Sequence, residues 1–78
     1  MARLDINSIQ KLEKNRNTVH TPVAATYSTF LHNNEKYFQI DTYGKPERLF
    51  TEKTSQSFQI DRSSAINLIS LLKNEFDI

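Results

Sequence analysis

The 78-residue sequence has no cysteine and no tryptophan, and it contains one glycine and two prolines. Without cysteine, neither a disulfide nor a zinc–thiolate site can form. A single glycine excludes the glycine-rich loops that hold phosphates. A domain of this size obtains only about 3–5 kcal/mol from its core. We therefore expect a second protein surface, from a twin chain or another partner, to supply further stability.

Neither sign of charge dominates, because ten Lys and Arg are balanced by nine Asp and Glu. Strong non-specific nucleic-acid binding usually needs a basic face, so any such face would have to be a local patch. No apolar run approaches the roughly 20 residues of a membrane span. The first residues also lack the apolar stretch of a signal peptide. These features predict a cytoplasmic protein with no membrane segment.

The N-terminal residues have the apolar spacing of a short helix. Ile6, Ile9 and Leu12 recur every three residues, which would give such a helix one apolar side. Residues 15–22 have no period, and Pro22 favours extended backbone before it. We therefore predict a short helix and linker over 1–22 and a single domain over 23–78. A frayed N-terminal tail is the alternative.

From Ala24 the apolar period changes to two, which is typical of strands with one buried face. The pair Asn33–Asn34 interrupts the first such run and predicts a hairpin turn, since Asn tolerates positive φ. The second run alternates Phe38, Ile40 and Thr42 with Tyr37, Gln39, Asp41 and Tyr43. Residues 55–61 alternate again, and a further short strand is considered near Leu49–Phe50.

After Asp61 the period changes to that of a helix, with Asp61 and Ser63 as candidate N-caps. The apolar positions are Ala65, Ile69, Leu72 and Phe76 in one stripe, widened by Ile66, Leu68 and Leu71. So wide an apolar surface usually contacts two partners: the sheet, and either a twin helix or the N-terminal helix. The predicted fold class is α+β, a small antiparallel sheet of three to four strands followed by one C-terminal packing helix.

Residues that commonly carry catalysis occur here without the partners they need. His20 and His32 are twelve residues apart and have no carboxylate at helical spacing, as is usual for surface histidines. No serine lies in a Gly-x-Ser-x-Gly turn. Asp41 and Asp61 could be neighbours that share a proton or a metal, but strand-end and capping roles are commoner. We expect no enzyme activity, no cofactor and no metal site.

The predicted polar face of the sheet is a candidate binding surface. It would present Tyr37 and Tyr43, and the nearby strand ends and loop carry Lys36, Lys45, Arg48, Lys53 and Arg62. Aromatic rings flanked by cations on an open sheet suit single-stranded nucleic acid, because bases stack on rings and phosphates contact Lys or Arg. The alternative is an ordinary solvent-facing surface, since Tyr is favoured in strands.

The order of these elements resembles the transcriptional coactivator positive cofactor four and its small bacterial relatives. The resemblance covers roughly 24–76 and is carried by 36–43, the polar loop through Lys53, and 57–61 leading into 65–76. It implies a curved sheet that binds single-stranded DNA, helices that pair two chains, and a role in transcription regulation. By position, the DNA-binding residues would be Tyr37, Tyr43, Lys45, Arg48 and Lys53, and the dimer-interface residues Ile69, Leu72 and Phe76.

Two hypotheses of different classes result. The first is a small bacterial or phage protein that binds single-stranded nucleic acid on its sheet as a homodimer. The second is a protein–protein interaction module, such as an inhibitor or accessory subunit, that docks through an exposed strand or its N-terminal helix. Salt dependence of nucleic-acid binding separates the two.

Overall fold

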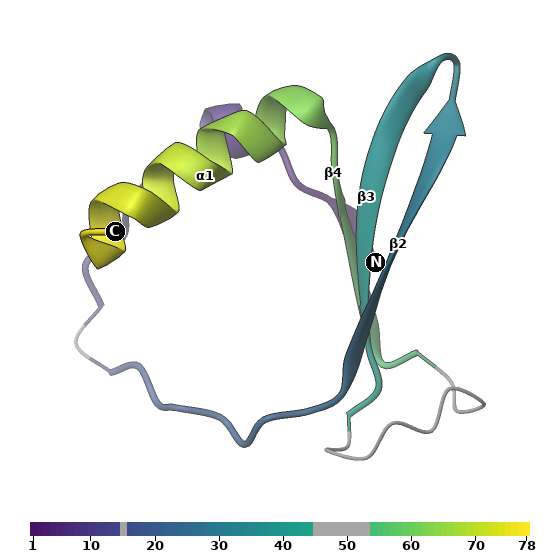
Figure 1. Cartoon of the computed structure of the whole chain (residues 1–78). Coiled ribbons are helices and arrows are strands. Elements are labelled where there is room, and N and C mark those ends of the chain that lie inside the picture. The colour runs from purple at the N-terminus through teal and green to yellow at the C-terminus, as the bar shows by residue number, and fades with distance from the viewer. Residues whose placement is uncertain (15, 45–53) are drawn as a thin grey trace.

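The computed structural model describes residues 1–14, 16–44 and 54–78. In these residues a four-stranded sheet is followed by one helix (Figure 1). The elements, in chain order, are β1 (Ala2–Arg3), the 3-10 helix η1 (Ile6–Ser8), β2 (Ala25–His32), β3 (Glu35–Thr42), β4 (Gln56–Ile60) and α1 (Arg62–Phe76). The α+β prediction is confirmed. The short strand considered near Leu49–Phe50 falls outside the described residues.

The sheet has the strand order β1-β4-β3-β2. Strands β2, β3 and β4 pair antiparallel, as predicted, whereas β1 adds a short parallel pairing at the free edge of β4. The β2–β3 hairpin turns at Asn33 and Asn34, whose φ angles of 51° and 64° are both positive. Two consecutive positive φ angles are typical of the type I′ turn, so the predicted hairpin turn is confirmed.

The period-two pattern gives the sheet two chemically different faces. Cross-strand pairs such as Phe38 with Ile60 and Ile40 with Phe58 place apolar side chains on one side, here called the apolar face. The neighbouring pairs of Gln39 with Gln59 and Asp41 with Ser57 define the opposite side, called the polar face. Because alternate residues of a strand point to opposite sides, the register confirms the predicted alternation in β3 and β4.

Asp61 lies between β4 and α1 and is the N-cap of the helix, as its sequence position predicts. Its carboxylate accepts a hydrogen bond from the backbone N–H of Ser64 at 2.9 Å, which satisfies one free donor of the first turn. This bond is also the main reason that the pKa of Asp61 lies below its ordinary value. At the other end, Asp77 adopts the left-handed conformation with φ 55°, a common way for a helix to stop.

The N-terminal segment departs from its predicted helix. Only Ile6–Ser8 are helical, and they form a single 3-10 turn capped by Asp5. Ile9 already has extended backbone, with φ −69° and ψ 140°. The apolar spacing of Ile9 and Leu12 does not produce a helix, and both side chains remain exposed. Asn7 and Ser8 favour local side-chain-to-backbone bonds over a longer helix, and the Ser8 hydroxyl does donate to the Asp5 carbonyl at 3.0 Å.

Ser64 anchors this N-terminal turn to the helix. It is 2 % exposed, accepts a hydrogen bond from the Ile6 backbone N–H at 3.3 Å and donates to the Leu4 carbonyl at 3.4 Å. The Leu4 N–H in turn donates to the Gln59 carbonyl at 2.9 Å, next to the β1–β4 pairing. The start of the chain is therefore tied to both β4 and α1.

The chain is expanded for its length. Its Cα radius of gyration is 14.5 Å, against about 11.5 Å for a compact domain of this length. Its accessible surface is 7124 Å², against about 4,900 Å² for a compact monomer of this mass. Among the described residues, the buried apolar side chains are Ile6, Ala24 and Tyr37. Figure 1 shows the reason, since α1 leaves the end of β4 and runs away from the sheet.

No helix in the described part of the chain is both long and apolar enough to cross a membrane.

Candidate binding surfaces

The centre of the polar face is a hydrogen-bonded ladder across β3 and β4. Gln39 donates to the Asp41 carboxylate at 2.9 Å, and Gln59 donates to the Gln39 side-chain carbonyl at 2.8 Å. The hydroxyl of Ser57 also donates to Asp41. These side chains therefore satisfy one another, and no buried side-chain nitrogen or oxygen among the described residues lacks a partner.

Asp41 is held as an anion in this ladder. The Ser57 hydroxyl, and then the Gln39 amide, hold the pKa of the Asp41 carboxyl below its ordinary value because both donate to its charged form. A fixed negative charge at the centre of the face repels a phosphate placed directly over it. A nucleic-acid backbone on the polar face would have to run to one side of Asp41.

The lowered pKa of Asp41 predicts that the stability of the fold depends on pH. A depressed folded-state pKa contributes stability that is present above the unfolded pKa, about 3.9 for Asp, and lost as pH falls through the folded value. We expect Asp41→Asn to flatten the decline in the free energy of unfolding below about pH 5. Urea titrations at a series of pH values measure this slope, with Glu13→Gln as the exposed control. Identical slopes for Asp41→Asn and the unmodified protein would show that the carboxylate contributes nothing.

Tyr37 lies on the polar face, but its ring is covered. It is 7 % exposed and stacks on Phe30 of β2, with ring centroids 5.5 Å apart and an interplanar angle of 19°. The Arg3 guanidinium lies 5.7 Å from the ring centroid and donates to the Tyr37 hydroxyl at 3.3 Å. That hydroxyl donates to Glu35 at 3.0 Å, which is the main reason the pKa of Tyr37 is raised. The ring is a packing element rather than an open platform for a base.

Tyr43 occupies the opposite end of the polar face. It is half-buried, and its hydroxyl shares a 2.8 Å hydrogen bond with the hydroxyl of Thr26 on β2. Tyr37 and Tyr43 thus lie on one side of the sheet, as predicted, but in different surroundings. The predicted phosphate-binding cations Lys45, Arg48 and Lys53 lie outside the described residues, so their positions relative to Tyr43 remain a prediction.

The predicted dimer-interface residues lie together on an uncovered stripe of α1. Ile69 is 57 % exposed, Leu72 44 % and Phe76 69 %. Helical spacing places all three on one side, in line with Ala65. The N-terminal segment covers a different side of the helix, where Lys11 pairs with Glu75 at 3.1 Å. Neither the sheet nor the N-terminal segment therefore covers the stripe.

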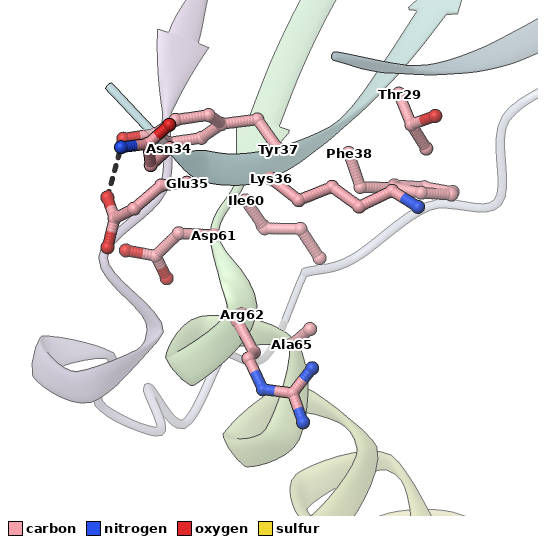
Figure 2. A pocket seen from close by; sticks show the side chains of 10 residues that line it. All are labelled: Thr29, Asn34, Glu35, Lys36, Tyr37, Phe38, Ile60, Asp61, Arg62 and Ala65. Carbon is pink, nitrogen blue, oxygen red and sulfur yellow. Dashed lines mark hydrogen bonds between the residues drawn. The ribbon is translucent and has the colours of Figure 1, made fainter. Parts of the chain in front are cut away.

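A groove of about 570 Å³ separates the β2–β3 hairpin from the first turn of α1 (Figure 2). It is lined by Thr29, Asn34, Glu35, Lys36, Tyr37, Phe38, Ile60, Asp61, Arg62 and Ala65. Figure 2 shows Ile60 between the Lys36 side chain, which runs beside the Phe38 ring, and Arg62, which lies next to Ala65. The carboxylates of Glu35 and Asp61 lie to the left of Ile60 in the same view. No local pattern in the sequence predicts this groove, because the groove depends on the angle between β3 and α1.

The same groove lies next to an exposed aromatic pair. Tyr27 of β2 stacks on Phe38, with ring centroids 5.2 Å apart and an interplanar angle of 15°. Tyr27 is well exposed, as is Leu31 further along the same strand. The apolar face is thus open from the groove to the edge of the sheet.

No group of three His, Asp or Glu side chains within 1–14, 16–44 and 54–78 lies close enough to hold a metal ion. His20 and His32 are exposed. Asp41 and Asp61, considered as a pair from the sequence, are each bonded to their own neighbours, Ser57 and Gln39 for Asp41 and Ser64 for Asp61. These bonds serve the sheet and the helix cap, respectively.

Comparison with known proteins adds no assignment: no family model, no curated protein and no solved structure matches this chain.

Proposed function

We propose that this chain is a small cytoplasmic, non-enzymatic binding protein that works as a homodimer and binds single-stranded nucleic acid. The observation that carries the proposal is the open apolar layer, formed by the apolar face of the sheet together with the stripe of α1. A single chain leaves this layer in water, although burial of apolar surface is the main stabilising term in folding. A second copy brings an identical apolar layer and can cover it symmetrically.

The non-enzymatic part of the proposal is supported by what the polar side chains do. The carboxylates of Asp41 and Asp61 and the hydroxyls of Ser57 and Ser64 are engaged in the ladder, the helix cap and the N-terminal anchor. Catalytic groups instead tend to cluster in a cleft with perturbed and mutually dependent pKa values.

The nucleic-acid part of the proposal is supported by the Tyr43 end of the polar face. Tyr43 is followed within ten residues by Lys45, Arg48 and Lys53, so one ring and three cations belong to one short stretch of chain. Stacking on a ring and pairing of cations with phosphates are the two contacts that single strands need. The Asp41 anion and the covered Tyr37 ring favour this end over the centre of the face.

Charge reversal tests this site. We expect Arg48→Glu with Lys53→Glu to abolish binding of a fluorescent single-stranded oligonucleotide at low salt. In the unmodified protein the logarithm of the affinity should fall with the logarithm of salt concentration, by a slope of about 0.7 per phosphate contact.

The matched control replaces Lys14 and Arg16 of the N-terminal segment with Glu. This double variant has the same net charge as the first. It should retain most of the affinity. Equal loss in both double variants would show that net charge alone, rather than a site after Tyr43, attracts the strand.

A protein partner is the second candidate, and one observation favours it. Strand β2 lies at the edge of the sheet, and over eight residues it pairs only with β3 among the described strands. An open edge can accept a further strand through main-chain hydrogen bonds. Binding of such a partner would depend little on salt, which distinguishes it from binding of a nucleic acid.

A further inference from the structure

We infer that the groove between β3 and α1 binds Phe76 of a second copy, and we call it the Phe76 seat. Antiparallel pairing of the two α1 helices about Ile69 would bring each Phe76 to the seat of the other chain. The inference rests on the proposed homodimer and specifies its geometry. Each chain would then complete the core of the other, because each would receive the partner's Phe76 and supply its own.

The lining of the groove combines an apolar centre with a rim of balanced charge. Phe38, Ile60 and Ala65 form the centre. The rim carries two cations, from Lys36 and Arg62, and two carboxylates, from Glu35 and Asp61. Because these charges cancel, the apolar centre selects the occupant, and a large apolar side chain fits it best.

The end of α1 carries such a side chain. Phe76 is 69 % exposed and continues the uncovered stripe of Ile69 and Leu72. Its neighbour Glu75 is paired with Lys11 on a different side of the helix, so Phe76 alone would enter the groove. There it would cover Phe38 and Ile60 of the partner subunit. A free strand of nucleic acid fits less well, because the centre of the groove is aliphatic as well as aromatic.

Helix geometry sets the register. In an antiparallel pair centred on Ile69, residue 76 of one chain lies opposite residue 62 of the other, and residue 72 lies opposite 66. Residues 62 and 76 are about 21 Å apart along the axis, so one helix spans from its own groove to that of its partner. A parallel pair would place the two Phe76 rings together, away from both grooves.

The surface area is sufficient for a stable interface. The chain exposes about 2,200 Å² more than a compact monomer of its mass, from its 7124 Å² total. Twice this excess lies within the range of about 2,000–5,000 Å² that obligate homodimers bury. The extended N-terminal segment contributes to this excess, so twice the excess is an upper bound on the area that two copies can bury.

The absence of cysteine allows the register to be tested directly by cross-linking. We expect Ile69→Cys to give a covalent dimer on mild oxidation, because disulfides form only when Cα atoms lie within about 7 Å. Mixing Ala65→Cys with Lys73→Cys should give a covalent heterodimer, and neither variant alone should cross-link. Asn74→Cys, on the opposite side of the helix, is the control and should stay uncross-linked. Homodimers of Ala65→Cys and of Lys73→Cys would instead indicate parallel helices and overturn the inference.

The absence of tryptophan allows the seat itself to be tested. The Phe76→Trp variant should emit at shorter wavelength in the dimer than after dilution, when the chains dissociate and unfold, because the indole ring is buried in the dimer. A Val19→Trp variant, changed at a fully exposed position, should show no such shift. If the Phe76→Trp variant is dimeric by mass but its emission is unshifted, the seat is contradicted and the proposed homodimer stands. If the unmodified protein is a folded monomer, both are contradicted.

Discussion

Replacing Leu72 with Asp is expected to leave a chain that is monomeric and largely unfolded at micromolar concentration. Leu72 lies on the uncovered stripe of α1 and is 44 % exposed in the single chain. In a dimer, burying this side chain stabilises the assembly by about 1.5–3 kcal/mol, and a buried carboxylate adds a large desolvation cost. Few apolar side chains are buried within the single chain to offset this loss of stability. We therefore expect a chain that cannot associate to unfold as well.

Light scattering and circular dichroism measure the two parts of this result. Asn74→Asp is the matched control, since it adds the same charge on the other side of the same helix and should leave mass and helix content unchanged. The unmodified protein should also unfold at a temperature that rises with protein concentration, because folding and association are coupled. A Leu72→Asp chain that stays folded, together with an unmodified protein that is a folded monomer, would contradict the dimer.

Replacing Tyr37 with Ala is the second change with a large expected effect. A buried aromatic side chain truncated to Ala costs about 3–5 kcal/mol, which equals the whole stability that a core of this size usually supplies. The ring stacks on Phe30 and lies beside Arg3, so its removal opens both contacts. We expect unfolding at room temperature, or a dimer with a greatly lowered melting temperature.

The variant Tyr37→Phe distinguishes the contribution of the ring to stability from that of the hydroxyl. It keeps the stacking on Phe30 but loses the bonds with Glu35 and Arg3, each worth about 1 kcal/mol. Urea denaturation should therefore rank the unmodified protein above Tyr37→Phe, and Tyr37→Phe well above Tyr37→Ala. If Tyr37→Ala kept full stability but lost oligonucleotide binding, the ring would be a base-stacking platform instead of a packing element.

The features that sequence reasoning predicted are local ones. The period of two in 36–43, the turn at Asn33–Asn34 and the cap at Asp61 each depend on residues within one strand, one turn or one helix end. The stripe of α1 is also local, because helical spacing alone places Ile69, Leu72 and Phe76 on one side.

The features that sequence reasoning missed depend on contacts between distant parts of the chain. A two-residue strand such as β1 is too short to show a period, yet it brings Arg3 to the polar face. Alternation assigned Tyr37 to a solvent-facing surface, because alternation cannot indicate that a residue 34 positions earlier covers the ring. Two small polar residues in the first turn of the predicted helix, Ser63 and Ser64, also gave no signal that one of them would anchor residues 4–6.

The parallel contact of β1 with β4 sets an order on folding. The β2–β3 hairpin closes around a two-residue turn, an event of about 1–10 μs. The bond between Ile6 and Ser64 instead spans 58 positions, so it cannot form until the last strand and the start of the helix exist. At a synthesis rate of about 5–20 residues per second, the hairpin is ready seconds before its N-terminal neighbour can be fixed. The N-terminal segment is therefore fixed only after β4 and the first turn of α1 have formed, and the edge of β4 stays open until then.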